Sequence, residues 1–317
     1  MSHKFRFTKD CMERLKNFAS GEAAPAPDAK EIKRDGLENS APKEPEQKEK
    51  AAVKKEKNKL QWADERPSVP ERQEARANAT LTVMTRTDIG RVRKSNQDAV
   101  IADDAERLYG VADGMGGHNG GETASTGARD GLNDLLRGKA PEMNSLRTGI
   151  MAVNRRLFLR QKEDESLSGM GTTLTALWVG EHVIYVGHVG DSRAYRLRDG
   201  RLEQMTQDHS MVAELVRAGM LTPEEAANHP MRNVITRAVG TEEGIDVDLM
   251  AEERRPGDVW LVCSDGLHGM VTDQAMTEIL LNNTLEEAAD RLLEAALAAG
   301  GRDNVSLVLL RDGEGQA

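Results

Sequence analysis

The chain has 317 residues, and its 53 acidic and 43 basic side chains give a formal charge of −10 at neutral pH. No run of about 18 apolar residues is present, which excludes a transmembrane helix, and residues 1–18 lack the apolar core of a secretory signal. Two cysteines, Cys11 and Cys263, are too few for a disulfide framework or a structural zinc site, so we expect a soluble cytoplasmic protein.

Charge is unevenly distributed along the chain. Residues 1–80 hold 18 basic and 15 acidic side chains, whereas residues 81–317 hold 25 and 38 and carry a net charge of −13. Domains that bind nucleic acid usually present a basic face, so we expect no nucleic-acid partner. A few basic residues focused on an anionic substrate remain compatible with this balance.

The N-terminal quarter of the sequence has little apolar surface to bury. Residues 20–79 consist largely of Ala, Pro, Glu and Lys, a composition that does not offset the entropy cost of ordering. We therefore predict a disordered, charged extension over residues 1–80 and a folded domain over residues 81–313. Residues 1–18 contain three phenylalanines, and two interpretations stay open for them, a short docking helix or a frayed terminus.

From residue 81 onward, the spacing of apolar residues switches between the period of strands and that of helices. Asp199-Gly200 marks a tight hairpin turn, and capping boxes begin at Thr222 and Thr284. In chain order the predicted elements are a strand at 81–90, two strands within 99–114, helices at 122–136 and 145–162, strands at 172–180 and 182–190, two strands within 192–205 on either side of the hairpin turn, short helices at 209–218 and 223–228, a buried strand at 257–266 running into a turn, a helix at 285–296 and a strand at 304–310.

The order of these elements indicates the fold class. Strands arrive in runs instead of alternating singly with helices, which favours an antiparallel α+β architecture over a doubly wound parallel sheet.

Four aspartates stand where strand-like runs end in turns, and in three cases a glycine is the immediate neighbour. Carboxylates gathered at one end of a sheet repel one another unless a cation neutralises them, and Mg²⁺ or Mn²⁺ prefers such oxygen ligands. A single Asp-Gly pair is a common turn, but four such sites together favour a metal centre. The four aspartates are Asp113, Asp191, Asp265 and Asp303.

A cluster of glycines surrounds the first of these aspartates, over residues 114–121. Because helix N-termini bind anions, a dinucleotide or phosphate loop is one interpretation. The spacing fits neither fingerprint, and no Gly-Lys-Ser/Thr follows. We instead expect a permissive loop that lets Asp113 and a backbone carbonyl face a metal ion.

Eight blocks of the sequence, in order over about residues 81–311, resemble the bacterial form of the metal-dependent serine/threonine protein phosphatases of type 2C. The resemblance implies an α-β-β-α sandwich of two antiparallel sheets flanked by helices, and it identifies residues 81–313 as the catalytic domain. The blocks are DIGRVRKSNQD, VADGMGGHNGGE, GMGTTLTAL, VGHVGDSRAYRLRDG, MTQDHSMVAEL, ITRAVG, LVCSDGL and GRDNVSLVLL.

The resemblance also implies the roles of individual residues. Asp113 would bridge two Mn²⁺ or Mg²⁺ ions, with the Gly114 carbonyl on one of them and Asp265 and Asp303 on the other. Asp191 corresponds to the ligand of a third ion in bacterial members. The remaining implied roles belong to Arg93, which would hold the substrate phosphate, to Asp98, which would order metal-bound water, and to residues 209–239, which would form a flap beside the site.

Two positions depart from the pattern of many relatives. Met115 stands where animal members often carry a histidine that protonates the leaving group, and His118 is an alternative that competes with a simple turn role. Gln97 replaces a common glutamate, so we do not expect it to assist metal binding.

The implied activity is hydrolysis of phosphoserine and phosphothreonine by a metal-activated water, with phosphoproteins as substrates, a serine/threonine kinase as counterpart and a monomeric enzyme. The alternative is a catalytically weak, phosphoprotein-binding or adaptor member of the same fold. Retention of all four aspartates favours the enzyme. A further hypothesis makes the N-terminal extension an adaptor or tether for the catalytic domain.

Overall fold

The computed structural model describes residues 81–116 and 120–313. The predicted extension over residues 1–80, the hypotheses for its first 18 residues and His118 lie outside these ranges, and the domain boundaries stay a prediction. Within the described ranges no helix is long and apolar enough to cross a membrane.

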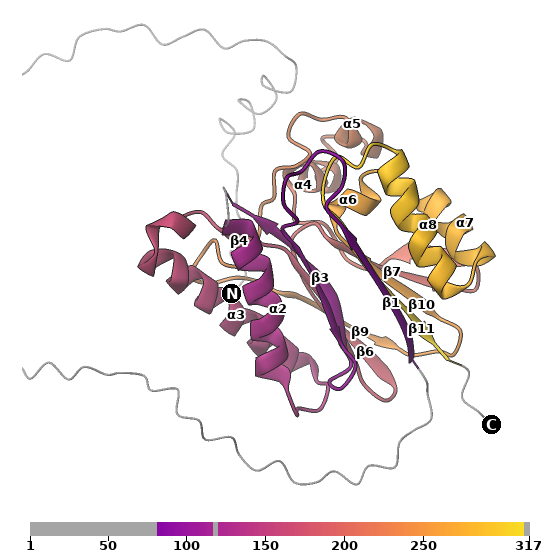
Figure 1. The fold of residues 1–317 in the computed structure, drawn as a ribbon, viewed down its shortest axis with the longest axis horizontal. Helices are drawn as coiled ribbons and strands as arrows, with labels where there is room; N and C mark the ends of the chain where they lie inside the picture. Colours follow the sequence, from indigo (N-terminus) through magenta and orange to yellow (C-terminus); the bar gives the residue numbers. More distant parts are fainter. Residues whose placement is uncertain (1–80, 117–119, 314–317) are drawn as a thin grey trace, which may run out of the picture. The chain divides into compact units, whose positions relative to one another are not determined.

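Two antiparallel sheets form the centre of the domain (Figure 1). The first has the order β1 (Leu81–Asp88), β11 (Val305–Asp312), β10 (Val259–Cys263), β7 (Arg193–Arg198) and β8 (Arg201–Gln204). The second has the order β2 (Asp98–Asp103), β3 (Leu108–Met115), β5 (Leu174–Val179), β6 (Val183–Val189) and β9 (Asp248–Glu253), with β4 (Gly171–Thr172) paired to β3.

Helices cover the outer face of each sheet, which completes four layers. The longer helices on the second sheet are α2 (Gly120–Leu136) and α3 (Met143–Glu163), with the short 3₁₀ helix η1 (Glu165–Leu167) after them. The helices on the first sheet are α6 (Asp265–His268), α7 (Asp273–Asn282) and α8 (Leu285–Ala298). Two short helices, α4 (Met211–Arg217) and α5 (Pro223–Ala227), lie between β8 and β9 in the chain.

Strands at the centre of each sheet are apolar on both faces because each face packs against another layer. In β10, Val259, Leu261 and Cys263 pack toward the helices. The alternate residues Trp260 and Val262 pack between the sheets. A period of two with both sets apolar is the pattern expected for a strand that is buried on both sides.

Most predicted elements are confirmed, including both capping boxes and the Asp199-Gly200 turn, whose residues have φ of 51° and 77°. Three differences stand out. The turn expected after β10 is the short helix α6, and the elements β9 and α7 were not predicted. Cys263 is a buried free thiol, as expected.

Candidate metal centre

The predicted aspartates lie where the ends of the two sheets meet. Asp113 near the end of β3 is the direct cross-strand partner of Asp98 at the start of β2. Asp191 lies in the loop between β6 and β7, Asp265 is the first residue of α6, and Asp303 precedes β11. Segments far apart in the chain therefore bring five carboxylates to one place. The fifth, beside the four strand-end aspartates, is Asp98.

The pKa values show that these carboxylates repel one another. Burial raises the pKa of Asp113 well above its ordinary value, and the charges of Asp98 and Asp265 raise it further. Burial, reinforced by Asp265 and Asp208, raises the pKa of Asp191 to about 8. The pKa values of Asp98 and Asp265 rise to about 6, again chiefly through burial. A bound cation would reverse this penalty.

Two carboxylate oxygens in the cluster have no hydrogen-bond partner although they are buried. They are Oδ1 of Asp98 and Oδ1 of Asp265. A buried polar atom without a hydrogen-bond partner destabilises the folded state. These two oxygens are therefore suited to bind a cation or to accept a hydrogen bond from a donor. The donor chemistry, all oxygen and all anionic, suits Mg²⁺ or Mn²⁺.

Within residues 81–116 and 120–313, no three His, Cys, Asp or Glu side chains enclose a common point closely enough to hold an ion by themselves. Mg²⁺ usually retains several waters and takes only one or two carboxylates from the protein. The arrangement therefore fits hydrated ions better than a closed protein cage.

The backbone around Asp113 is held tightly. The amide of Asp113 donates to Oγ1 of Thr173 at 2.8 Å, and the amide of Thr173 donates back to the Asp113 carbonyl at 2.8 Å. At Gly114, a Cβ atom would lie 2.1 Å from the carbonyl oxygen of Gly121 and 2.6 Å from that of Gln97. Only glycine permits this close approach of three backbone segments.

Arg93 extends from the loop after β1 to the edge of the cluster. Its Nη2 atom donates to Oδ2 of Asp303 at 2.6 Å, and this bond raises the arginine pKa above its ordinary value. The loop is fixed by Asn304, whose amide nitrogen donates to the carbonyls of Ile89 at 3.0 Å and Ser95 at 2.9 Å. Arg93 is half exposed, at 51%, so its guanidinium is open to an anion in solution.

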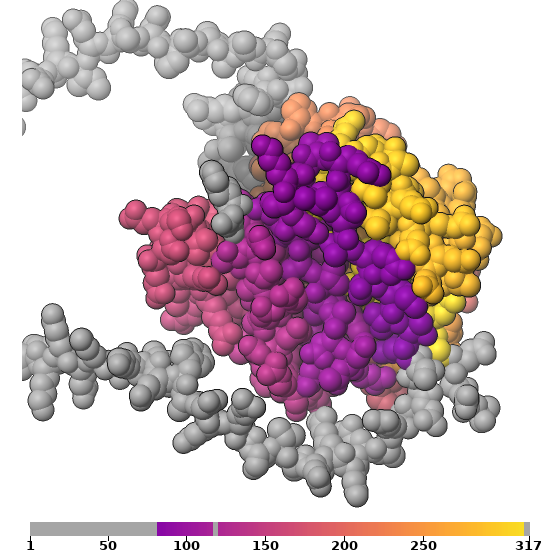
Figure 2. Space-filling model, viewed as in Figure 1, coloured from indigo at the N-terminus to yellow at the C-terminus, as the bar shows by residue number. Residues whose placement is uncertain are grey.

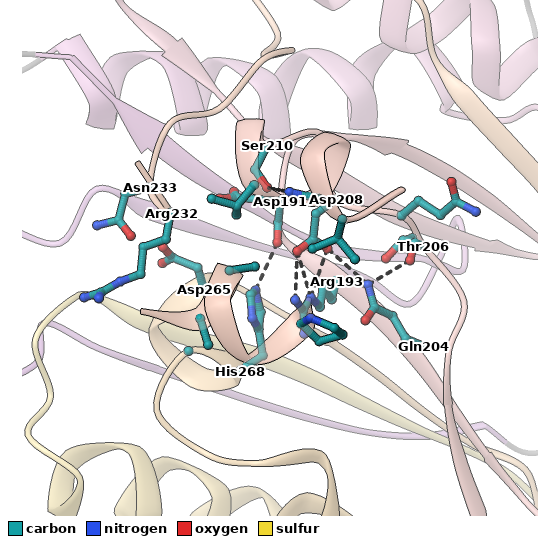
Figure 3. Close-up of a pocket in the computed structure, with 18 of the residues that line it drawn as sticks. Asp191, Arg193, Gln204, Thr206, Asp208, Ser210, Arg232, Asn233, Asp265 and His268 are labelled. Carbon is teal, nitrogen blue, oxygen red and sulfur yellow. Dashed lines mark hydrogen bonds and ion pairs between the residues drawn. The ribbon is translucent and has the colours of Figure 1, made fainter. Parts of the chain in front are cut away.

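A cavity of about 890 Å³ opens beside the carboxylates (Figure 3). Asp191, Asp265 and Asp303 line one part of it, and residues of α4 and α5 line the other. The segment that carries these two helices is the predicted flap, residues 209–239. The cavity therefore connects the carboxylate cluster with the flap.

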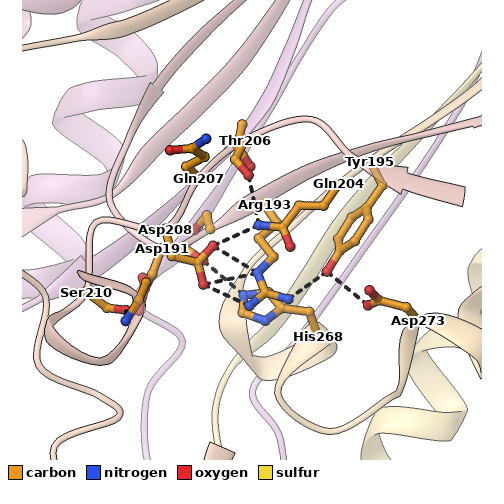
Figure 4. Close-up of polar contacts among 12 residues, drawn as sticks. Asp191, Arg193, Tyr195, Gln204, Thr206, Gln207, Asp208, Ser210, His268 and Asp273 are labelled. Carbon is orange, nitrogen blue, oxygen red and sulfur yellow. Dashed lines mark hydrogen bonds and ion pairs between the residues drawn. The ribbon is translucent and has the colours of Figure 1, made fainter. Parts of the chain in front are cut away.

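A polar network supports the loop that carries Asp191 (Figure 4). The guanidinium of Arg193 donates to the carboxylate of Asp208 through Nε at 2.9 Å and Nη2 at 2.8 Å, and to the hydroxyl of Tyr195 at 2.9 Å. Nε2 of His268 donates to the carbonyl of Asp191 at 3.0 Å. The bond from His268 holds the backbone of Asp191 directly, and the pair of Arg193 with Asp208 ties the start of β7 to the segment before the flap.

Sequence reasoning did not single out several residues that build the site. A usable signal existed for Asp208, His209 and Asn304, because each lies in a block that also contains a predicted site or flap residue. His268 directly follows the block that holds Asp265, and Thr173 had no such signal. What the sequence did not reveal was that four of these side chains bond to the backbone of a different loop, whereas the carboxylate of Asp208 pairs with the guanidinium of Arg193. These residues are Thr173, Asp208, His209, His268 and Asn304.

Comparison with known proteins gives consistent likenesses. Residues 87–300 match the family described as protein phosphatase 2C. The chain is 42% identical over 238 residues to the serine/threonine protein phosphatase PstP of Mycobacterium tuberculosis, an alignment that covers 74% of this chain and 46% of that protein. It is 40% identical over 235 residues to the serine/threonine phosphatase stp of Listeria monocytogenes, covering 71% and 93% of the two chains.

Solved structures show the same likeness. The crystal structure of the catalytic domain of PstP in complex with two manganese ions superposes with a TM-score of 0.69 at 39% identity. The match covers 74% of this chain and 100% of that one. The chain thus spans about half the length of the full mycobacterial protein but all of its crystallised catalytic domain.

Proposed function

The chain belongs to the protein phosphatase 2C family, and from this premise we propose that it hydrolyses phosphoserine and phosphothreonine esters in proteins. Family and four-layer fold were both predicted from the sequence, and both are confirmed. The enzyme is a metal-dependent phosphoric monoester hydrolase that uses Mn²⁺ or Mg²⁺, the class to which its named relatives and the manganese-bound PstP domain belong.

The ions would be held by the carboxylates of Asp113, Asp191, Asp265 and Asp303 and by the carbonyl of Gly114. The observation that carries this assignment is the partnerless buried oxygen of Asp265 within a set of mutually repelling carboxylates. When bound there, such ions would polarise phosphoryl oxygens and lower the pKa of a water molecule.

The protein's own groups position the reactants. Arg93 presents a planar, exposed guanidinium that donates paired hydrogen bonds to phosphoryl oxygens better than the point charge of a lysine. Asp98 is oriented by the hydroxyl of Ser264, which donates to its Oδ2 at 2.8 Å. Oδ1 of Asp98 is buried without a partner and would accept a hydrogen bond from the water that the site orders.

Partners and location follow from the chemistry. Phosphoprotein substrates require a serine/threonine kinase to supply them, so the enzyme acts opposite such a kinase. We place the reaction in the cytoplasm, where the free thiol of Cys263 would stay reduced, and we propose a monomeric enzyme.

The experiment is the Asp113→Asn variant with Asp134→Asn on the exposed face of α2 as its control. We expect the first to lose Mn²⁺-dependent phosphate release from a phosphothreonine peptide by about 100-fold or more, since changes one shell further from a metal already cost 10–100-fold. The control should keep full activity, and circular dichroism should show both variants folded. If the Asp113→Asn variant turned over substrate as fast as the unmodified protein, the metal assignment would be refuted. If the unmodified protein bound Mn²⁺ in calorimetry yet released no phosphate, the phosphoprotein-binding alternative would be supported.

A further inference from the structure

Beside the carboxylate cluster lies a patch of opposite charge, which we call the cationic rim and define as Arg91, Lys94 and Arg302. We propose that the cationic rim docks an acidic or additionally phosphorylated segment flanking the phosphoresidue of a protein substrate. This inference rests on the proposed function and adds a substrate preference to it.

The rim is one structural unit although it comes from two distant loops. The amide of Arg91 donates to the carbonyl of Gly301 at 2.7 Å. A Cβ atom on Gly301 would lie only 2.9 Å from Cγ of Arg91, so the two loops are in direct contact. In Figure 2 the indigo loop after β1 and the yellow segment before β11 meet on the visible face. Asn304 ties the same two loops together, which keeps the rim in a fixed place.

The charges of the rim are not neutralised by the surrounding protein. Residues 91–95 and Arg302 are exposed. In the part of the chain that the structure describes, Arg93 pairs with Asp303, whereas no ion pair or hydrogen bond engages the side chains of Arg91, Lys94 or Arg302. Three positive charges therefore remain available for a bound anion.

The rim contrasts with the rest of the domain. Residues 81–317 carry a net charge of −13, so an approaching anion is repelled from most of the surface and attracted at this patch. Local fields of this kind raise the concentration of a charged ligand and its association rate. The acidic surface around the rim would repel long polyanions and anionic membranes, because these would contact that surface as well as the rim. A short acidic protein segment fits the patch better.

The position of the rim sets which substrate residues it contacts. Arg91 is two residues from Arg93 and Lys94 is adjacent to it, so their Cα atoms lie within about 7 Å of that of Arg93, the span of two extended residues. Arg302 lines the cavity together with Asp303. If Arg93 holds the phosphate, acidic residues of the substrate that lie about two or three positions along its chain from the phosphoresidue reach the rim.

An exposed apolar side chain completes the patch. Val92 lies between Arg91 and Arg93 in the sequence and is 65% exposed. Such a side chain offers contact to the aliphatic part of a docked segment. The rim therefore combines charge with a small apolar surface, as binding patches commonly do.

The test compares two phosphothreonine peptides that differ only in having Glu or Gln at the positions two and three residues from the phosphothreonine. We expect wild-type kcat/KM to be about tenfold higher for the Glu peptide at low salt, a size typical of a few exposed charge contacts, and the ratio to fall toward one as salt rises. The combined variant R91Q/K94Q/R302Q should lose the ratio, mainly through KM, and keep its turnover of p-nitrophenyl phosphate.

The control removes the same net charge from the outer helix α3, as R147Q/R155Q/R160Q, and should retain the tenfold preference. Equal use of the two peptides by the wild type, or an equal loss in both triple variants, would overturn the rim proposal. Tighter binding of a 20-base-pair DNA duplex or of phosphatidylserine vesicles than of the Glu peptide would show the occupant to be wrong. Release of phosphate from none of the substrates with Mn²⁺ present would instead refute the proposed phosphatase function.

Discussion

His209, at the start of the flap, is only 4% exposed and joins three parts of the structure. Its Nδ1 atom accepts the amide hydrogen of Gly190 at 3.0 Å, and its own amide donates to the Gly190 carbonyl at 2.8 Å. Because Nδ1 accepts, we place the ring proton on Nε2, which lies 3.1 Å from Oδ2 of Asp248 and 2.9 Å from Nη1 of Arg237. We predict that the bond to Gly190 contributes more to the stability of the domain than the contact with Asp248, since Gly190 directly precedes Asp191.

Two substitutions separate the two sides of the ring. His209→Asn places an acceptor near the position of Nδ1 and loses the contact with Asp248. His209→Gln keeps a donor near the position of Nε2 and leaves the buried amide of Gly190 without an acceptor. An unsatisfied buried donor costs about 1–3 kcal/mol. Asp248 has a half-exposed side chain and keeps Arg237 at 2.7 Å, so losing its second partner costs less than about 1 kcal/mol.

We therefore expect the Asn variant to be more stable than the Gln variant by about 1–2 kcal/mol. In a domain of this size that corresponds to a difference in Tm of roughly 2–8 °C, which differential scanning calorimetry resolves. Asn is the smaller side chain and leaves the larger void, so packing alone predicts the opposite order. A Gln variant equal to or more stable than the Asn variant would show that the bond to Gly190 does not anchor the flap.

Two further predictions concern other buried positions. Burial and the nearby His209 lower the pKa of His188 to about 4, from 6.5. Between pH 6.5 and pH 4 the unfolded chain therefore binds a proton at this residue that the folded chain does not. The free energy of unfolding thus falls by on the order of 3 kcal/mol as the pH is lowered from 6.5 to 4. His188→Gln should flatten this part of the pH–stability curve in urea titrations, and an unchanged curve would contradict the assignment. Gly114→Ala should destabilise the domain by about 1–3 kcal/mol or more and abolish phosphate release, because its Cβ would overlap backbone oxygens. Gly244→Ala, with open space around its Cβ, should do neither.

The sequence predicted the architecture well because the signals were local and mutually consistent. The alternation in β10 and β11 reports two buried faces, and the capping box at Thr284 fixes the start of α8. Elements with weak local signals were missed. Strand β9 is half-exposed and acidic, and its place beside β6 is set by tertiary pairing and not by an apolar pattern.

The site was predicted at the level of residue types but not of contacts. Asp113 and Asp265 were recognisable because Asp-Gly after an apolar run is a visible pattern. His209 and Asn304 act on backbone groups of loops 19 and more than 200 residues away, and no local pattern encodes such a distant partner. Side chains that bond to a remote backbone are therefore the part of an active site that requires the fold to be known.

The carboxylate cluster connects the acidity of the domain with its action on anionic esters. Buried carboxylates such as Asp113 and Asp191 cost stability while nothing neutralises them, as their raised pKa values show. A cation that binds only the folded cluster removes this cost and stabilises the native state by mass action. Such a cation would supply, at a cluster of carboxylates, the positive charge that an anionic phosphate ester needs. On the proposed function, the acidic residues of the cluster would favour catalysis once ions are bound, and the acidic surface elsewhere would direct anionic substrates toward Arg93 and the cationic rim.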